Sequence, residues 1–125
     1  MTDVPPYHGD LLVILRHGPH GSSLLREGLD AALVAAAFGR DVSLLFMGEG
    51  ISALVRDQQV GPLGQKGTAA TLQMLEMYDI DRLLVDGEGL AGLGLAPRDL
   101  MLPVEVLDSS AMAVQPKVHR LVLTF

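Results

Sequence analysis

The sequence contains no cysteine and no tryptophan, and aromatic residues make up only 4% of its 125 residues. Without cysteine the chain can form no disulfide, bind no metal through thiolates and use no cysteine nucleophile. Basic residues are also few, since 9 Lys and Arg stand against 15 Asp and Glu and give a net charge of −6. Because these basic residues form no cluster, we expect no direct binding to nucleic acid.

The chain also lacks a long apolar run and a secretory signal. Its longest apolar stretch, 29–38, is too short to cross roughly 30 Å of hydrocarbon. The first segment, 1–10, has neither a basic start nor an apolar core. We therefore expect a cytoplasmic protein that makes no contact with a membrane.

Hydrophobic residues account for 49% of the chain and charged residues for 19%, with a mean hydropathy of +0.35. This composition excludes a disordered chain, and the length suits one domain with its own core. We expect residues 1–10 to be a flexible leader and residues 11–125 to form that domain. The high apolar content indicates further burial against a partner.

Short apolar runs alternate with segments of helical periodicity. Continuous apolar runs are typical of buried strands, and they predict strands at 11–16, 41–47, 82–85, 104–107 and 120–125. Helices are predicted after Ser22 or Ser23 and at 51–55, 68–78, 88–95 and 109–113, with a glycine-rich loop at 56–67. The first helix has one apolar face, formed by Leu25, Leu29, Ala32, Leu33 and Ala36. Alternation of this kind predicts an α/β domain with a largely parallel sheet of about five strands, covered by helices on both faces.

Ligands of parallel sheets bind at the carboxyl ends of the strands, which here are 17–23, 47–50, 86–89 and 108–110. The loop 18–23 leads into a helix N-terminus that could hold an anion. It lacks the Gly-Lys-Ser/Thr of a P-loop, so we favour a tight turn with a capping serine.

The triplet Arg16-His17-Gly18 resembles the opening motif of the histidine phosphatases. That chemistry needs a nucleophilic imidazole and a second histidine, and the distant candidate, His119, precedes a strand instead of ending one. A phosphatase using His17 stays as an alternative. A metal site at His17 and His20 is disfavoured because no third ligand accompanies them, and we expect neither a metal nor a cofactor.

Two other groups of side chains have non-catalytic interpretations. Met74, Met77 and Tyr78 form a stripe that indicates core or interface packing. Four carboxylates surround the third predicted strand, with two before it and two after it, so we expect no acid/base pair among them. They are Asp79, Asp81, Asp86 and Glu88.

Four further segments of the sequence are informative when they are taken together. They are Pro19-His20-Gly21 with Arg26-Glu27-Gly28-Leu29-Asp30-Ala31, FMGEGISAL at 46–54, LQMLEMYDI at 72–80, and LVLTF at 121–125. In this order they resemble the first helix, the second-strand segment, the Tyr-Asp-Ile helix end and the final strand of the TusC/DsrF branch of the DsrE/DsrF/DsrH sulfur-relay family. The similarity extends over residues 11–125.

The resemblance implies a flavodoxin-like, three-layer α/β/α fold in a subunit of a sulfurtransferase complex. It implies TusB-like and TusD-like partners in a dimer of heterotrimers that supports 2-thiolation of the wobble uridine of tRNA. A DsrF-like subunit of a sulfur-oxidation complex is the alternative pathway, and a homo-oligomer is the alternative state of the isolated chain.

The resemblance also locates the family's sulfur-carrying cysteine. That cysteine belongs to the TusD/DsrE-like subunit, and its position falls near Asp86 of this chain. Because a carboxylate cannot form a persulfide, we interpret the chain as a non-catalytic subunit. The uncharged segment 90–95 and His119 are further departures from the family's pattern.

The matched residues suggest contact with partner subunits. We expect His20, Gly21, Arg26, Glu27 and Asp30 to organise a subunit interface. The alternative is that Gly21 and Gly28 serve turn and helix packing, while the charged residues form a solvated face. Two more residues are predicted to contact partners, namely Tyr78 and Asp79.

Overall fold

The sheet is entirely parallel, in a computed structural model that describes residues 7–20, 22–56 and 69–125. Its strand order is β4-β3-β2-β1-β5, so the first strand lies between the second and the last. The strands are β1 (Gly9–Leu15), β2 (Val42–Phe46), β3 (Arg82–Asp86), β4 (Glu105–Leu107) and β5 (His119–Thr124). The predicted parallel sheet of about five strands is confirmed.

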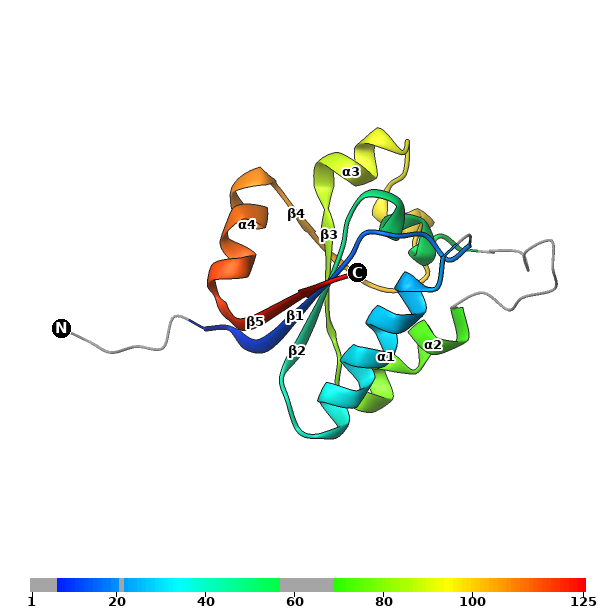
Figure 1. Ribbon diagram of the computed structural model, residues 1–125. Helices are drawn as coiled ribbons and strands as arrows, with labels where there is room; N and C mark the ends of the chain where they lie inside the picture. The colour runs from blue at the N-terminus through cyan, green and yellow to red at the C-terminus, as the bar shows by residue number, and fades with distance from the viewer. Residues whose placement is uncertain (1–6, 21, 57–68) are drawn as a thin grey trace.

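Helices cover both faces of this sheet, as Figure 1 shows with the sheet nearly edge-on. On one side lie α1 (Leu24–Ala37) and α2 (Ala69–Gln73), and on the other lies α4 (Ser109–Val114), while α3 (Gly87–Gly92) follows the carboxyl end of β3. Four 3-10 helices complete the elements of the described ranges: η1 (Gly48–Leu54), η2 (Leu75–Tyr78), η3 (Pro97–Asp99) and η4 (Gln115–Lys117). This arrangement confirms the three-layer α/β/α architecture.

Several element boundaries differ from the predicted ones. β1 begins at Gly9, before the predicted start at Leu11, because its first residues pair with β5. The predicted helix 68–78 is divided into α2 and η2, and the helix predicted at 51–55 is the longer η1. Most of the predicted loop 56–67, and residues 1–6 of the predicted leader, lie outside the described residues. Within the described ranges, no helix is long and apolar enough to cross a membrane.

The core is divided unequally between the two faces of the sheet. The larger cluster joins alternate residues of β1 to the buried face of α1, and its members include Leu11, Val13, Leu15, Leu25 and Leu29. The smaller cluster lies under α4 and contains four buried side chains: Leu12, Leu45, Leu84 and Leu107. Most of the hydrophobic stabilisation therefore comes from the face that α1 and α2 cover.

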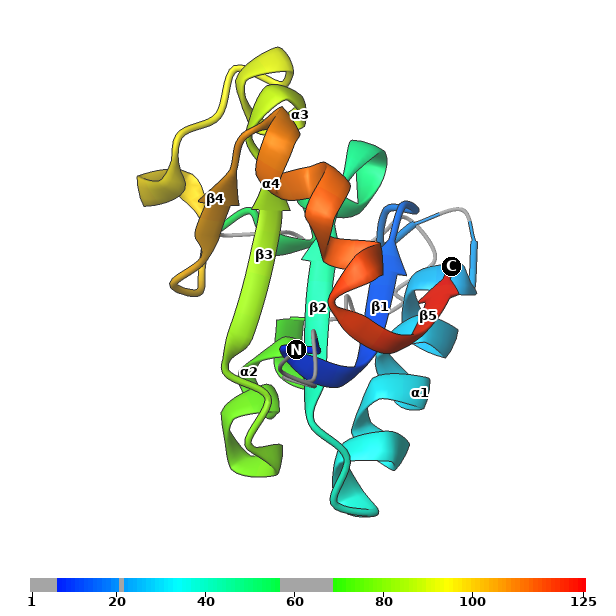
Figure 2. The ribbon, with the colours of Figure 1, turned by 90° about the vertical axis from the view of Figure 1, so that its left-hand side faces the viewer.

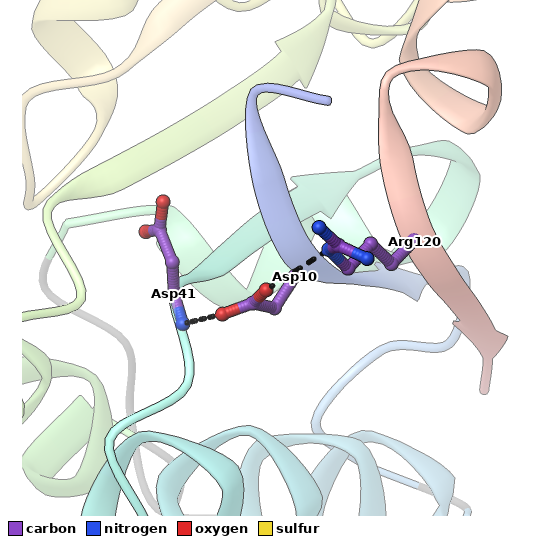
Figure 3. Close-up of polar contacts among 3 residues, drawn as sticks. All are labelled: Asp10, Asp41 and Arg120. Carbon is purple, nitrogen blue, oxygen red and sulfur yellow. Dashed lines mark hydrogen bonds and ion pairs between the residues drawn. The ribbon is translucent and has the colours of Figure 1, made fainter. Parts of the chain in front are cut away.

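An acidic side chain links three segments at the amino end of the sheet (Figure 3). One carboxylate oxygen of Asp10 accepts a hydrogen bond from the backbone N–H of Asp41 at 2.9 Å. The other oxygen lies 3.6 Å from Nε of Arg120, whose guanidinium stacks 5.0 Å from the ring centre of Tyr7. Because these groups are partly exposed, they fix the entry into β1, β2 and β5 more than they stabilise the fold.

His119 makes a second, buried link at the start of β5. Its Nδ1 donates to the carbonyl oxygen of Gln115 at 2.8 Å, which leaves Nε2 to accept from the hydroxyl of Ser43 at 2.9 Å. The ring reaches β2 by passing over Gly9 of β1, where a Cβ would lie 3.2 Å from the imidazole Cδ2. With 3% of His119 and 1% of Ser43 exposed, the pair is closed to substrates and is a structural contact.

We expect Ser43→Ala to destabilise the fold by about 1–3 kcal/mol, because Nε2 of His119 would remain buried without a partner. The measurement is urea unfolding at pH 7. Ser109→Ala is the matched control, since Ser109 is exposed. Equal stability of the Ser43→Ala variant and the wild-type chain would contradict the proposed contact.

Candidate functional site

Four segments meet at the carboxyl edge of the sheet, where the strand arrows end in Figure 2. Residues 16–20 follow β1, η1 follows β2, Asp86 ends β3 and Asp108 follows β4. These segments include the strand ends at which the sequence predicted that a ligand would bind. The parallel sheet brings them together because all its strands end at the same edge.

An open depression of about 470 Å³ lies at this edge, between the loop after β1, η1 and the end of α3. Its polar side chains are an imidazole, a carboxylate and a hydroxyl, and the rest of its lining is apolar or glycine. The lining residues are Gly18, Pro19, His20, Glu49, Ser52, Val55 and Leu93. A shallow surface of this composition is better suited to contact with a protein than to enclosing a small molecule.

Beside the depression, η1 approaches the end of β1 closely. A Cβ on Gly50 would overlap the carbonyl oxygen of Leu15, so the approach is one that only glycine permits. The hydroxyl of Ser52 donates to the carbonyl oxygen of Glu49 at 2.6 Å. A Cβ on Gly18 would in turn lie 3.2 Å from that hydroxyl. Backbone packing therefore determines the shape of the surface.

We expect Gly50→Ala to lower the free energy of unfolding by at least about 2 kcal/mol, because the new methyl group must displace backbone atoms. Gly92→Ala is the matched control. A Cβ there meets nothing within 4 Å, so alanine at the end of α3 should be neutral or stabilising by up to about 1 kcal/mol. Thermal unfolding of both variants tests this, and equal effects would contradict the close approach.

The histidines do not assemble the phosphatase site that the Arg16-His17-Gly18 triplet suggested. His17 follows the carboxyl end of β1, whereas His119 begins β5 at the opposite edge and is buried against Ser43. Nδ1 of His17 is buried and has no hydrogen-bond partner among the described residues. Within the part of the chain that the structure describes, no three His, Cys, Asp or Glu residues are placed to hold a metal ion.

Asp86 ends β3 and immediately precedes α3. A Cβ on Gly89 would lie 3.1 Å from its Oδ2, so the carboxylate rests on the first turn of α3. A Cβ on Gly87 would lie 2.8 Å from the carbonyl oxygen of Leu107, so the backbone at the start of α3 packs closely against the end of β4. Asp79 and Asp81 lie before β3, at the other edge, as the sequence predicted.

Asp108 is the best-bonded carboxylate of the edge. Its Oδ1 accepts from the backbone N–H of Ala111 and from the hydroxyl of Ser110, both at 2.8 Å. The hydrogen bond from Ala111, and after it that from the hydroxyl of Ser110, holds the pKa of Asp108 below its ordinary value of 3.8, against the opposing effect of burial. Asp108 therefore caps α4, a role that the sequence analysis did not predict.

We expect Asp108→Ala to reduce the stability of the chain at pH 7 through loss of this cap. Since the pKa is lowered in the folded state, the carboxylate stabilises the fold fully above pH 3.8, and this contribution disappears as the pH falls through the lower, folded pKa. The difference in Tm between wild type and the Asp108→Ala variant should therefore become smaller as the pH falls. Asp108→Asn, which keeps the acceptor oxygen but cannot titrate, should retain most of the stability; a pH-independent difference for Asp108→Ala would contradict the cap.

The residues predicted to contact partners fall into two groups at opposite edges. His20 lies in the depression, and Arg26, Glu27 and Asp30 are exposed on the first two turns of α1. Among the described residues, no ion pair joins Arg26 to Asp30. Gly21 lies outside the described residues, and Tyr78 and Asp79 lie at the amino edge, before β3.

The fold and the carboxyl-edge site define a class of small parallel α/β proteins. The chain belongs to the DsrE/DsrF-like family, whose model matches residues 10–125.

Individual relatives indicate which members of this family the chain is similar to in sequence. The chain is 41% identical over 102 residues to a Pseudomonas aeruginosa protein named "Protein TusC homolog", covering 82% of this chain and 86% of the relative. It is 37% identical over 98 residues to the Vibrio parahaemolyticus protein of the same name, covering 78% and 83%. The resemblance seen in the sequence is thereby confirmed.

Solved structures support the fold. The ychN protein of E. coli superposes with a TM-score of 0.79 at 21% identity, covering 93% of this chain and 98% of that one. MTH1491 from Methanobacterium thermoautotrophicum, described as a protein of unknown function, gives 0.65 at 16% identity and covers 93% and 100%. At these identities the likeness concerns the fold alone.

Proposed function

We propose that this chain is the non-catalytic, TusC-like subunit of a cytoplasmic sulfur-relay complex that supports 2-thiolation of the wobble uridine of tRNA. Its identity to proteins named TusC homolog, over most of their length, supports this assignment. The same name favours tRNA thiolation over sulfur oxidation. The non-catalytic role is supported by one observation: the chain has no cysteine, and a carboxylate, that of Asp86, stands at the end of β3.

Sulfur transfer through a persulfide requires a thiolate that attacks and then releases sulfur. In this chain the end of β3 offers a carboxylate resting on α3, which cannot take up sulfane sulfur. The thiol must therefore come from another subunit. The contribution of this chain to the reaction is to bind and position that subunit.

The proposed contact surface for TusB-like and TusD-like subunits is the carboxyl edge with the start of α1. His20 and Glu49 lie in the depression, and Arg26, Glu27 and Asp30 are exposed on the first two turns of α1. The charged groups of α1 make no ion pair within the described chain. They are therefore available to pair with charges of a partner.

The test is co-expression of a tagged chain with the TusB-like and TusD-like proteins of the same organism, followed by affinity purification. Wild type should recover both partners and restore 2-thiouridine to the tRNA of a strain that lacks its own TusC-like gene. Arg26→Ala and Asp30→Ala should lower partner recovery several-fold, while Arg98→Ala, on exposed η3, serves as the matched control.

The possible failures of this experiment have different meanings. Absence of both partners from the wild-type purification, together with no restored thiolation, would contradict the function. Full recovery of the partners with the Arg26→Ala and Asp30→Ala variants would contradict the contact surface and leave the function standing.

A further inference from the structure

The amino edge of the sheet, opposite the proposed relay surface, exposes large apolar side chains. Phe38 is 82% exposed and Met77 is 80% exposed, the highest values among the large hydrophobic residues that the structure describes. Phe38 ends α1 just before β2, and Met77 lies in η2 just before β3. Because β2 and β3 are adjacent and parallel, both side chains lie at one edge. Exposed apolar groups concentrated in this way are typical of an interface.

Phe38 is held in place by its backbone although its ring is exposed. Its N–H bonds to the carbonyl oxygens of Val34 and Ala35 at 3.2 Å, and the N–H of Arg40 returns to Ala35 at 3.0 Å. Gly39 adopts a φ of +84°, and the space where its Cβ would lie is open. The helix therefore ends in a defined turn that presents an exposed ring, with a guanidinium two residues further along the chain.

A pocket of about 200 Å³ lies at the same edge, between η2 and the segment that precedes β4. The lower part of Figure 2 shows the end of α1 and the helical segment before β3 at one end of the molecule, and the segment before β4 lies higher, beside β3. The walls of the pocket are apolar and are formed mainly by Leu72, Leu75, Ile80, Leu83, Leu102 and Pro103. A cavity lined in this way, at about this volume, can hold one aromatic ring.

Two exposed carboxylates, Glu76 and Asp81, stand at the rim of this pocket. Neither forms an ion pair with a described residue, and Arg40 forms none either. The nearby cation, Arg82, is directed to His8, with Nη1 3.4 Å from the carbonyl oxygen and Nη2 3.3 Å from Nδ1. Within the described chain, the rim therefore lacks a counter-charge, and Arg40 lacks an anion.

The ring and the guanidinium of one chain match the pocket and the carboxylates of a second copy. Phe38 does not fill the pocket of its own chain, since most of its surface is exposed. We propose that two copies associate through their amino edges, with Phe38 of each in the pocket of the other and Arg40 beside Glu76 and Asp81. Such a reciprocal contact obeys two-fold symmetry and closes on itself. It leaves the carboxyl edge free and does not rest on the sulfur-relay assignment.

The test is sedimentation velocity of the purified full chain between about 1 and 200 μM, with circular dichroism to verify folding. Wild type should show a concentration-dependent dimer. Phe38→Ala should raise the dimer dissociation constant at least about tenfold, as for a central aromatic anchor. Leu93→Ala, at the carboxyl edge and 50% exposed, is the control and should leave the constant unchanged.

A charge exchange identifies the pairing. Arg40→Glu and Asp81→Arg should each weaken the dimer, because like charges then face one another, and the double variant should restore it. A wild-type chain that stays monomeric throughout would overturn the proposal, as would a dimer insensitive to Phe38→Ala. A Phe38→Ala variant that remains dimeric but no longer recovers a TusB-like or TusD-like protein would instead assign this surface to a different subunit.

Discussion

The central strands β1 and β2 are almost completely buried, and this constraint decides where polar chemistry can occur in the molecule. Along β2 all five side chains are buried. One of them, Ser43, is polar, and its burial is tolerated because His119 supplies its hydrogen-bond partner. An unpaired polar group in these strands would incur a desolvation cost of about 1–3 kcal/mol. Polar and charged groups therefore collect at the two edges of the sheet, which serve as separate surfaces.

Much of this fold could be predicted from the sequence, because continuous apolar runs such as Leu11–Leu15 separated by amphipathic helices have few other solutions. The inward residues Leu25 and Leu29 of α1 followed directly from their spacing. The strand order did not, since the position of β5 beside β1 depends on long-range pairing that local patterns do not encode. For the same reason the 3-10 geometry of η1 was missed: it is set by the approach of Gly50 to Leu15.

The candidate site was predictable in its location but only partly in its contacts. Parallel strands place Asp86 and the loop after β1 at one edge whatever the strand order. The resemblance to sulfur-relay proteins indicated in addition that Asp86 lies near the position of the family's sulfur-carrying cysteine. The cap formed by Asp108 could have been found from the Asp-Ser-Ser sequence before a helix. The link from His119 to Ser43 could not, because it joins residues far apart in the chain and depends on the absence of a side chain at Gly9.

The pairing of β5 with β1 also has a consequence for how the chain folds. Gly9 lies opposite His119 in this pair, so β1 cannot complete its hydrogen bonding until nearly the whole domain has left the ribosome. Until then one edge of β1 is open to pairing with other chains. Contacts of such long sequence separation slow folding. The imidazole of His119 can therefore take its buried place between Gln115 and Ser43 only after β5 has been synthesised.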